Sequence, residues 1–350
     1  FTLVGVLVIA CLIRASVGEP GVHAAPAAPT LWWNVAYVGR DVVDLKWYPE
    51  LGDLGYKITR DGDLIAELGA AATFFRDTEP LPGAHTYTLY RVTASGDQPD
   101  GADTVTLGAI EGMLYQDLTW SSGTYDVAVN VEVMPGVTLS IEPGVKVSAK
   151  TEAFHPHGLF GAGVLDVEGA VLDLTDLWIQ GDGSTIRDSE FLPGFYSIYV
   201  DADARLEGNV FNSALTFDFG EVAEVEMIGN ILRGSIGFFR TMDQATVTME
   251  RNVFSQPASG EIVLGLGSTA PAVVSDNRLE GCPYLDGVLQ VNGSGAVTIQ
   301  DNAFRCSDSS RYGALAIKVN SNNPGVIEGN VFECPYRYGG PNDAAAIQIN

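Results

Sequence analysis

The chain is poor in positive charge. Its 350 residues include 19 Lys and Arg against 44 Asp and Glu, which gives a formal net charge of −25. A nucleic-acid partner is therefore not expected, because binding to phosphate requires clustered Lys and Arg. The acidic balance suits a solvated surface, a cation site or a salty medium, and the solvated surface is the simplest of these interpretations.

Residues that ligate transition metals or act as nucleophiles are also scarce. The chain has four Cys and four His. His155 and His157, in "FHPHG", form the only close His pair. Zinc sites need at least three protein ligands, and no third ligand stands near this pair, so it is weak evidence for zinc.

An apolar run opens the chain. Residues 1–13 are too few for a comfortable membrane span, and small residues and Pro follow as far as residue 30. This order is typical of an export signal with a linker. We therefore expect residues 1–30 to direct export and to be the only membrane contact, with the rest of the protein secreted or on the cell surface. Since no Met starts the chain, we expect the sequence to be incomplete or processed.

Two alternatives for this segment stay open. "VIAC" (8–11) resembles a loose lipobox, which would place a lipid on Cys11. "FTLVGVLVIA" resembles the mature start of a type IV pilin, although Gly5 stands where that family has Glu. The pilin alternative implies a filament subunit. All three interpretations place most of the protein outside the cytoplasm.

Residues 31–110 carry the pattern of a β-sandwich. In "VVDLKW" (42–47), Val43, Leu45 and Trp47 share one face, and "YKITRDGDLIAEL" (56–68) predicts two strands around a polar turn. Alternation broken by turn residues at short intervals is typical of sandwiches. "YKITRDG", "FRDTEPLPG" and "YRVTA" together resemble a bacterial fibronectin type III module, which implies a spacer or binding role.

Residues 111–350 contain a repeat that is marked by a recurring Asn at intervals of 21 to 28 residues. Within the same part of the chain, "GVTLSIEPGVKV" (136–147) resembles the entry segment of a parallel β-helix. The reference positions are Asn209, Asn230, Asn252, Asn277, Asn302 and Asn330. An apolar residue stands three positions before each Asn and another two positions after it. Such periods indicate a stacked solenoid.

The repeat resembles the right-handed parallel β-helix family, which includes pectate lyases, polygalacturonases, alginate epimerases and many non-enzymatic surface proteins. In this fold the apolar positions point into a shared core and coils stack about 4.8 Å apart. The Asn side chains would stack at a bend and bond to one another and to the backbone, so we interpret them as structural. Cys282, Cys306 and Cys334 follow the same register and predict a buried stack of thiols, with a disulfide between two of them as the alternative.

One pair of carboxylates is a candidate cation site. In "YVDADARLEGN" (199–209), Asp203 and Arg205 should point outward, and Glu224 and Glu226 occupy the same positions one coil later. Asp203 and Glu224 could therefore bind Ca²⁺, the one cofactor that the sequence suggests. The simpler interpretation is an exposed acidic patch that Arg205 relieves by pairing with Glu226.

The enzymes of the β-helix family carry motifs that this chain lacks. Of the polygalacturonase set, only "AIKVN" (316–320) is present, without the Arg, the Gly-His-Gly or the Asp pair. We therefore predict a surface or secreted scaffold that binds carbohydrate or another surface partner. The alternative is a polysaccharide lyase, hydrolase or epimerase whose catalytic coils lie beyond residue 350. The chain stops at "AAAIQIN" without a cap, so we expect the β-helix to continue.

Overall fold

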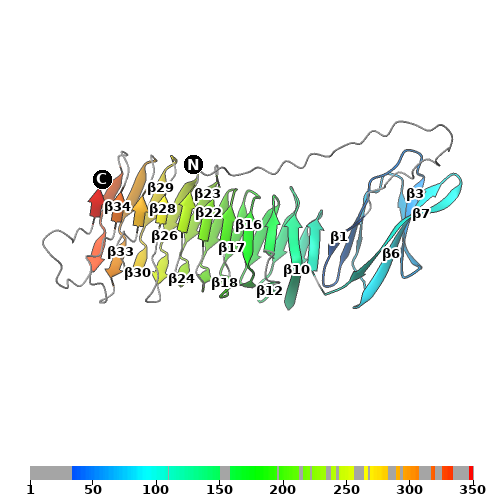
Figure 1. Ribbon diagram of the computed structural model, residues 1–350, viewed down its shortest axis with the longest axis horizontal. Helices are drawn as coiled ribbons and strands as arrows, with labels where there is room; N and C mark the ends of the chain where they lie inside the picture. The colour runs from blue at the N-terminus through cyan, green and yellow to red at the C-terminus, as the bar shows by residue number, and fades with distance from the viewer. Residues whose placement is uncertain are drawn as a thin grey trace, which may run out of the picture.

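The computed structural model describes residues 34–108, 110–149, 158–194, 197–212, 216–220, 223–233, 238–241, 244–255, 264–266, 269–282, 289–291, 295–306, 317–319, 325–333 and 347–349. These residues form strands and turns, and none of them lies in a helix. Accordingly, no described segment is a helix long and apolar enough to cross a membrane. Figure 1 shows two antiparallel sheets at one end of an elongated molecule and a row of stacked coils along the rest.

The coils form a parallel β-helix, as predicted, and the structure shows that it has three faces. In each coil one strand contributes to each face, and every strand pairs in parallel with its counterpart in the neighbouring coil. Face 1 consists of β8 (Ile110–Leu114), β10 (Thr124–Val133), β13 (Gly158–Gly161), β16 (Asp176–Ile179), β19 (Ser197–Val200), β22 (Thr216–Phe219), β25 (Phe238–Thr241), β28 (Leu264–Leu266), β31 (Leu289–Val291), β34 (Ile317–Val319) and β37 (Ile347–Ile349).

The other two faces are equally regular. Face 2 is a ten-stranded sheet of β9 (Leu118–Trp120), β11 (Thr138–Ile141), β14 (Val164–Glu168), β17 (Ser184–Arg187), β20 (Ala204–Glu207), β23 (Glu224–Ile228), β26 (Thr246–Glu250), β29 (Ala272–Ser275), β32 (Val297–Gln300) and β35 (Val326–Glu328). Face 3 begins with the first half of β10 and continues through β12 (Lys146–Ala149), β15 (Val171–Asp173), β18 (Glu190–Phe191), β21 (Val210–Phe211), β24 (Ile231–Arg233), β27 (Val253–Ser255), β30 (Arg278–Cys282), β33 (Ala303–Cys306) and β36 (Val331–Glu333).

The apolar positions of the repeat form the core of the solenoid. Leu206 pairs with Met227 in the next coil, and Met227 pairs with Met249. All three side chains are fully buried. On face 3 the rings of Phe191 and Phe211 stack with their centroids 4.4 Å apart. Because strands repeat at about 4.8 Å, identical inward positions are always in van der Waals contact.

The asparagines form a hydrogen-bonded ladder inside this core. Oδ1 of Asn252 accepts bonds from the backbone N–H and the side-chain Nδ2 of Asn230, both of 2.9 Å. Nδ2 of Asn252 donates to the Met227 carbonyl at 2.8 Å and to Oδ1 of Asn277 at 3.0 Å. The same pattern links Asn209, Asn230, Asn252, Asn277, Asn302 and Asn330. Each side chain therefore satisfies backbone groups that turn inward at the bend.

Two antiparallel sheets precede the solenoid. One contains β1 (Asn34–Val38), β2 (Val43–Lys46) and β5 (Phe74–Asp77), and the other has the order β4 (Asp63–Gly69), β3 (Gly55–Arg60), β6 (Ala84–Thr93), β7 (Gly96–Thr106). Trp47, from just after β2, lies in one buried cluster with Tyr56 of β3 and Tyr87 of β6. This cluster is separate from the solenoid core.

The first sheet continues directly into the solenoid. β1 pairs antiparallel with β8, through Tyr37 and Gly112, and β8 in turn pairs parallel with β10. Gly112 has φ of +108°, and a Cβ there would lie 2.2 Å from the Ala36 carbonyl oxygen, so only glycine fits this approach. The pairing runs across residues 110–111, where the sequence analysis placed the boundary between two units. β1 thus covers the open edge that face 1 would otherwise present.

Side chains strengthen this junction. The Arg76 guanidinium donates to both carboxylate oxygens of Asp44, at 2.7 and 2.8 Å, and to the carbonyls of Asp117 and Gln116, at 2.7 and 3.3 Å. Asp44 is fully buried, and burial raises its pKa while Arg76 opposes that effect. Trp120 Nε1 donates to the Tyr37 hydroxyl at 3.2 Å. A buried charge of this kind requires its partner, so Arg76 ties the first sheet to the first coil.

Some sequence predictions fall on residues outside the described set. These are the export segment at residues 1–30, the pair His155 and His157, and Cys334. The backbone of Cys282 pairs with that of Cys306 in the next coil, after a register shift at this point. The thiol stack stays a prediction.

Candidate functional site

The predicted carboxylate pair lies in a shallow groove on face 2. The register that pairs Arg205 with Glu226 also places Asp203 beside Glu224. A hollow of about 210 Å³ is lined by both acids together with Ser184 and Arg205. Asp203 and Glu224 are exposed at the start of their strands.

Asp203 already has a structural role in this groove. Its Oδ1 accepts a 2.8 Å hydrogen bond from the backbone N–H of Glu224, and its own N–H donates to Asp182 Oδ1 at 3.3 Å. The acids therefore bridge successive coils by satisfying backbone donors at the sheet margin. In the part of the chain that the structure describes, no group of three or more His, Cys, Asp or Glu could hold a metal ion. The Ca²⁺ site stays a prediction.

Arg205 neutralises much of the acidic patch, as the sequence suggested. Its guanidinium donates to Glu226 at 2.5 Å and to Glu207 at 2.9 Å. Hydrogen bonding to Arg205 holds the pKa of Glu207 below its ordinary value. A fixed guanidinium beside the carboxylates opposes a second cation, because like charges a few ångströms apart repel. This groove is therefore a poor cation site.

Face 1 carries a different feature, which we call the aromatic strip: Phe160, Trp178 and Tyr199. These residues occupy the same outward position on β13, β16 and β19, since Phe160 pairs with Trp178 and Trp178 with Tyr199. The ring centroids are 6.3 and 5.6 Å apart. Trp178 is 37% exposed, and the other two rings are half-buried. Three adjacent coils thus present a continuous aromatic surface to solvent.

The central ring of the strip is held in place by an acid of the next coil. Trp178 Nε1 donates a 2.6 Å hydrogen bond to Oδ2 of Asp201, which follows β19. Gly220 leaves the space that this acid occupies, because a Cβ there would lie 2.3 Å from Asp201 Oδ1. The indole is therefore pre-organised on the surface.

Polar groups border the strip. Asp218 follows Tyr199 in register, and among the described residues its buried Oδ1 has no hydrogen-bond partner. Asp176 lies two residues before Trp178 on the same face, and burial raises its pKa while a hydrogen bond from Thr175 lowers it. The half-buried carboxyl of Asp176 can accept a hydrogen bond from a hydroxyl of a ligand that rests on the rings.

The sequence analysis did not identify the strip. Its alignment of repeats started at Asn209, after Tyr199, the last residue of the strip. A signal was nevertheless present. "LWIQGDG" and "IYVDADA" each place an aromatic residue between two aliphatic ones, directly before a turn rich in Asp and Gly. An aromatic residue flanked by buried neighbours on a strand must point outward.

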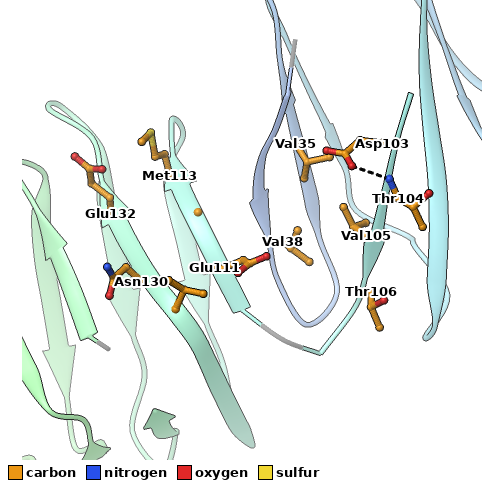
Figure 2. Close-up of a pocket in the computed structure, with 12 residues that line it drawn as sticks. Val35, Val38, Asp103, Thr104, Val105, Thr106, Glu111, Met113, Asn130 and Glu132 are labelled. Carbon is orange, nitrogen blue, oxygen red and sulfur yellow. Dashed lines mark hydrogen bonds between the residues drawn. The ribbon is translucent and has the colours of Figure 1, made fainter. Parts of the chain in front are cut away.

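A larger hollow lies where the N-terminal sheets meet the solenoid (Figure 2). This junction pocket has a volume of about 680 Å³. Asp103, Thr104 and Thr106 of β7 line one side of it, and Met113 of β8 and Glu132 of β10 line the other. Its walls combine valine side chains with carboxylates and hydroxyls.

Comparisons with known proteins leave the function open. No family model matches the chain, and no curated protein matches it significantly. Among solved structures, the chain is similar to pectate lyase PelI from Erwinia chrysanthemi in complex with tetragalacturonic acid. The identity is 11% and the TM-score 0.23, with 83% of this chain and 90% of that chain covered. At these values the likeness carries no argument about function.

Proposed function

We propose that the protein is a secreted or cell-surface scaffold that binds carbohydrate on face 1 of its β-helix. The observation that supports this proposal is the aromatic strip, with rings on three successive coils and the central indole fixed by Asp201. Contiguous apolar surface that is exposed on a folded protein is an indicator of an interaction site. The C–H faces of sugar rings pack well against aromatic faces, and their hydroxyls need nearby acceptors.

The N-terminal part fits the same role. The two antiparallel sheets with Trp47, Tyr56 and Tyr87 in one core support a fibronectin type III-like module, which would act as a spacer or a second binding unit. An export signal within residues 1–30 would place both parts outside the cytoplasm. Under this proposal the partner is a polysaccharide of a cell surface or its surroundings.

The test is glycan binding by the wild-type protein and by Trp178→Ala. We expect binding to several immobilised polysaccharides in affinity electrophoresis, and its loss in the variant. Leu64→Ala removes an apolar residue that is 54% exposed on β4, the strand farthest from β7 in its sheet, and this control should bind like the wild type. Binding that survives Trp178→Ala unchanged would contradict the proposal.

The same samples test the enzymatic alternative. Release of reducing ends, or a rise in the absorbance of unsaturated uronates, would indicate a hydrolase or a lyase. Binding without turnover would support the scaffold. Tight binding of a protein from the cell surface, with no glycan bound, would favour the other surface partner that the sequence analysis left open.

A further inference from the structure

We propose that the aromatic strip and the junction pocket form one continuous site for a neutral glycan chain that lies along the solenoid axis. This inference rests on the proposed function, because it names the ligand class and the extent of the same site. It assigns to the N-terminal sheets a direct part in binding, since β7 closes the far end of the pocket.

The strand register makes the two features continuous. Met113 pairs with Glu132, Glu132 pairs with Phe160, and Phe160 is the first ring of the strip. Met113 and Glu132 also line the junction pocket, and both are exposed. Outward positions at the same register lie about 4.8 Å apart on neighbouring coils. One column of side chains therefore runs from the pocket, along the strip, to Asp218.

The spacing of the rings suits a chain parallel to this column. Centroid separations of 6.3 and 5.6 Å are comparable to the rise of one sugar in an extended, β-1,4-linked chain. The planes of neighbouring rings are inclined by 63° and 44°, so successive sugars would meet a ring face at one position and a ring edge at another. A chain longer than the strip then reaches the pocket, whose volume lies within the range of ordinary ligand sites.

The pocket offers groups that recognise a sugar. In Figure 2, Asp103 and Thr106 stand on β7, and Val35 and Val38 of β1 lie between this strand and the strands that carry Glu111 and Glu132. Asp103 Oδ1 accepts a 2.8 Å bond from the backbone N–H of Thr104, which fixes its carboxylate in the pocket wall. Hydroxyls and carboxylates bond to sugar hydroxyls, and the valine side chains between them pack against sugar C–H groups.

The charges of the site determine the class of glycan. Among the described residues that line the pocket and the column as far as Asp218, the charged side chains are carboxylates: Asp103, Glu111, Glu132 and Asp218. The next residue in register, Arg240, lies one coil beyond this site. Asp176 and Asp201 border the same column. A polyuronate would bring further negative charge within about 8 Å of these groups, where salt screens incompletely. A neutral glycan meets no such repulsion.

The test compares chain lengths and charges by isothermal titration calorimetry. The probes are β-1,4-linked oligosaccharides of glucose, mannose and N-acetylglucosamine, each as trisaccharide and hexasaccharide, with oligogalacturonates of the same lengths. We expect at least one neutral hexasaccharide to bind about tenfold more tightly than its trisaccharide. Thr106→Met should occupy space in the pocket without adding a ring and should abolish this gain. Thr119→Met, at an exposed position on face 2, is the matched control and should keep the gain.

The outcomes separate this inference from the proposed function. The inference would be overturned by any of three results: a gain with chain length that survives Thr106→Met, no gain at all, or oligogalacturonates that bind as tightly as neutral chains. If any of these glycans still bound in a manner that required Trp178, the proposed function would stand. If no glycan bound, both would fail. Thermal melting of both Met variants shows whether they are folded.

Discussion

The indole Nε1 of Trp178 donates a 2.6 Å hydrogen bond to Oδ2 of Asp201, which stands one coil further along the solenoid. Asp201→Ala should remove this bond and free the indole to rotate. We expect glycan affinity to fall about fivefold, equivalent to about 1 kcal/mol, as is typical of one hydrogen bond. Because Asp201 is exposed, the melting temperature should change little. Calorimetric titration and thermal melting measure the two effects.

Two further variants make this prediction specific. Asp201→Asn keeps an acceptor for the indole and should retain most of the affinity. Gly220→Ala should weaken binding without altering either partner, because its Cβ would lie 2.3 Å from Asp201 Oδ1 and 2.9 Å from Asp201 Cα. Asp63→Ala, at an exposed position on β4, is the control. Equal affinity in Asp201→Ala and the wild type would show that the bond does not position the ring.

The Asn ladder should be a major source of stability. Asn252→Ala removes four hydrogen bonds and leaves the Asn230 backbone N–H and the Met227 carbonyl buried without these partners, while Oδ1 of Asn277 keeps its bond from the backbone N–H of residue 252. Each unsatisfied group costs about 1–3 kcal/mol, so we expect a loss of about 3 kcal/mol or more in the free energy of unfolding. Urea denaturation followed by circular dichroism provides the measurement.

The matched control for the ladder is Asn212→Ala. Asn212 lies on the outside of the same solenoid and bonds through its side chain to Glu190 at 2.7 Å. Its replacement should cost less than about 1 kcal/mol. A similar loss in both variants would mean that the buried ladder contributes no more than surface contacts. Glycan binding by folded Asn252→Ala should be normal, because the ladder lies inside the core.

The parts of the fold that repeat were predictable from the sequence. An apolar residue at a fixed offset from each Asn has to point inward in every coil, so positions such as Leu206, Met227 and Phe211 could be assigned to the core before the structure. The pairing of Arg205 with Glu226 followed from the same register and is confirmed at 2.5 Å. Periodicity propagates along a solenoid because each coil contacts only its neighbours.

Features that occur once were not predictable in this way. The junction depends on the antiparallel pairing of β1 with β8, through Tyr37 with Gly112 and Val38 with Glu111. Tyr37 and Gly112 are 75 residues apart and share no local pattern. The aromatic strip precedes Asn209, the first Asn of the aligned repeats, and the repeat before Asn209 has Ser189 at the Asn position. Asp203 illustrates a third case. Its outward position was predictable, but its bond to the Glu224 N–H depends on the bend of the backbone.

The contact between β1 and β8 should require Gly112. Gly112→Ala places a Cβ 2.2 Å from the Ala36 carbonyl oxygen, in addition to the strain of a positive φ. Gly52 has a similar φ of +104° with nothing within 4 Å, so Gly52→Ala measures the strain alone. We expect Gly52→Ala to cost about 1–2 kcal/mol and Gly112→Ala clearly more. Equal losses in urea denaturation would mean that the close approach relaxes without cost.

Calcium should not stabilise the groove on face 2. Asp203 uses one carboxylate oxygen for the Glu224 N–H, and Arg205 supplies a fixed positive charge nearby. We therefore expect millimolar Ca²⁺ and chelator to give the same melting temperature, in the wild type and in Asp203→Asn. A rise with Ca²⁺ that disappears in Asp203→Asn would instead establish the cation site that the sequence suggested.

His85 should make the stability of the N-terminal sheets depend on pH. Its Nδ1 lies 2.6 Å from Asp61 Oδ2 and its Nε2 lies 2.6 Å from the Leu81 carbonyl oxygen. Both partners are acceptors, so both ring nitrogens must carry protons for both bonds to form. The hydrogen bond to Asp61 is the main cause that raises the pKa of His85 above its value in the unfolded chain, and burial opposes the rise.

The direction of the effect follows from this shift. A group whose pKa is raised in the folded state contributes stability that is complete below its unfolded pKa of about 6.5 and is lost as pH rises through the folded pKa. We expect the urea midpoint of the wild type to fall between about pH 6 and about pH 9, and His85→Gln to show a smaller fall over the same range. Asp61, whose pKa the same bond lowers, titrates in the acidic range and does not contribute in this window. A wild type and a His85→Gln variant with the same pH dependence would show that the imidazole does not gain its proton on folding.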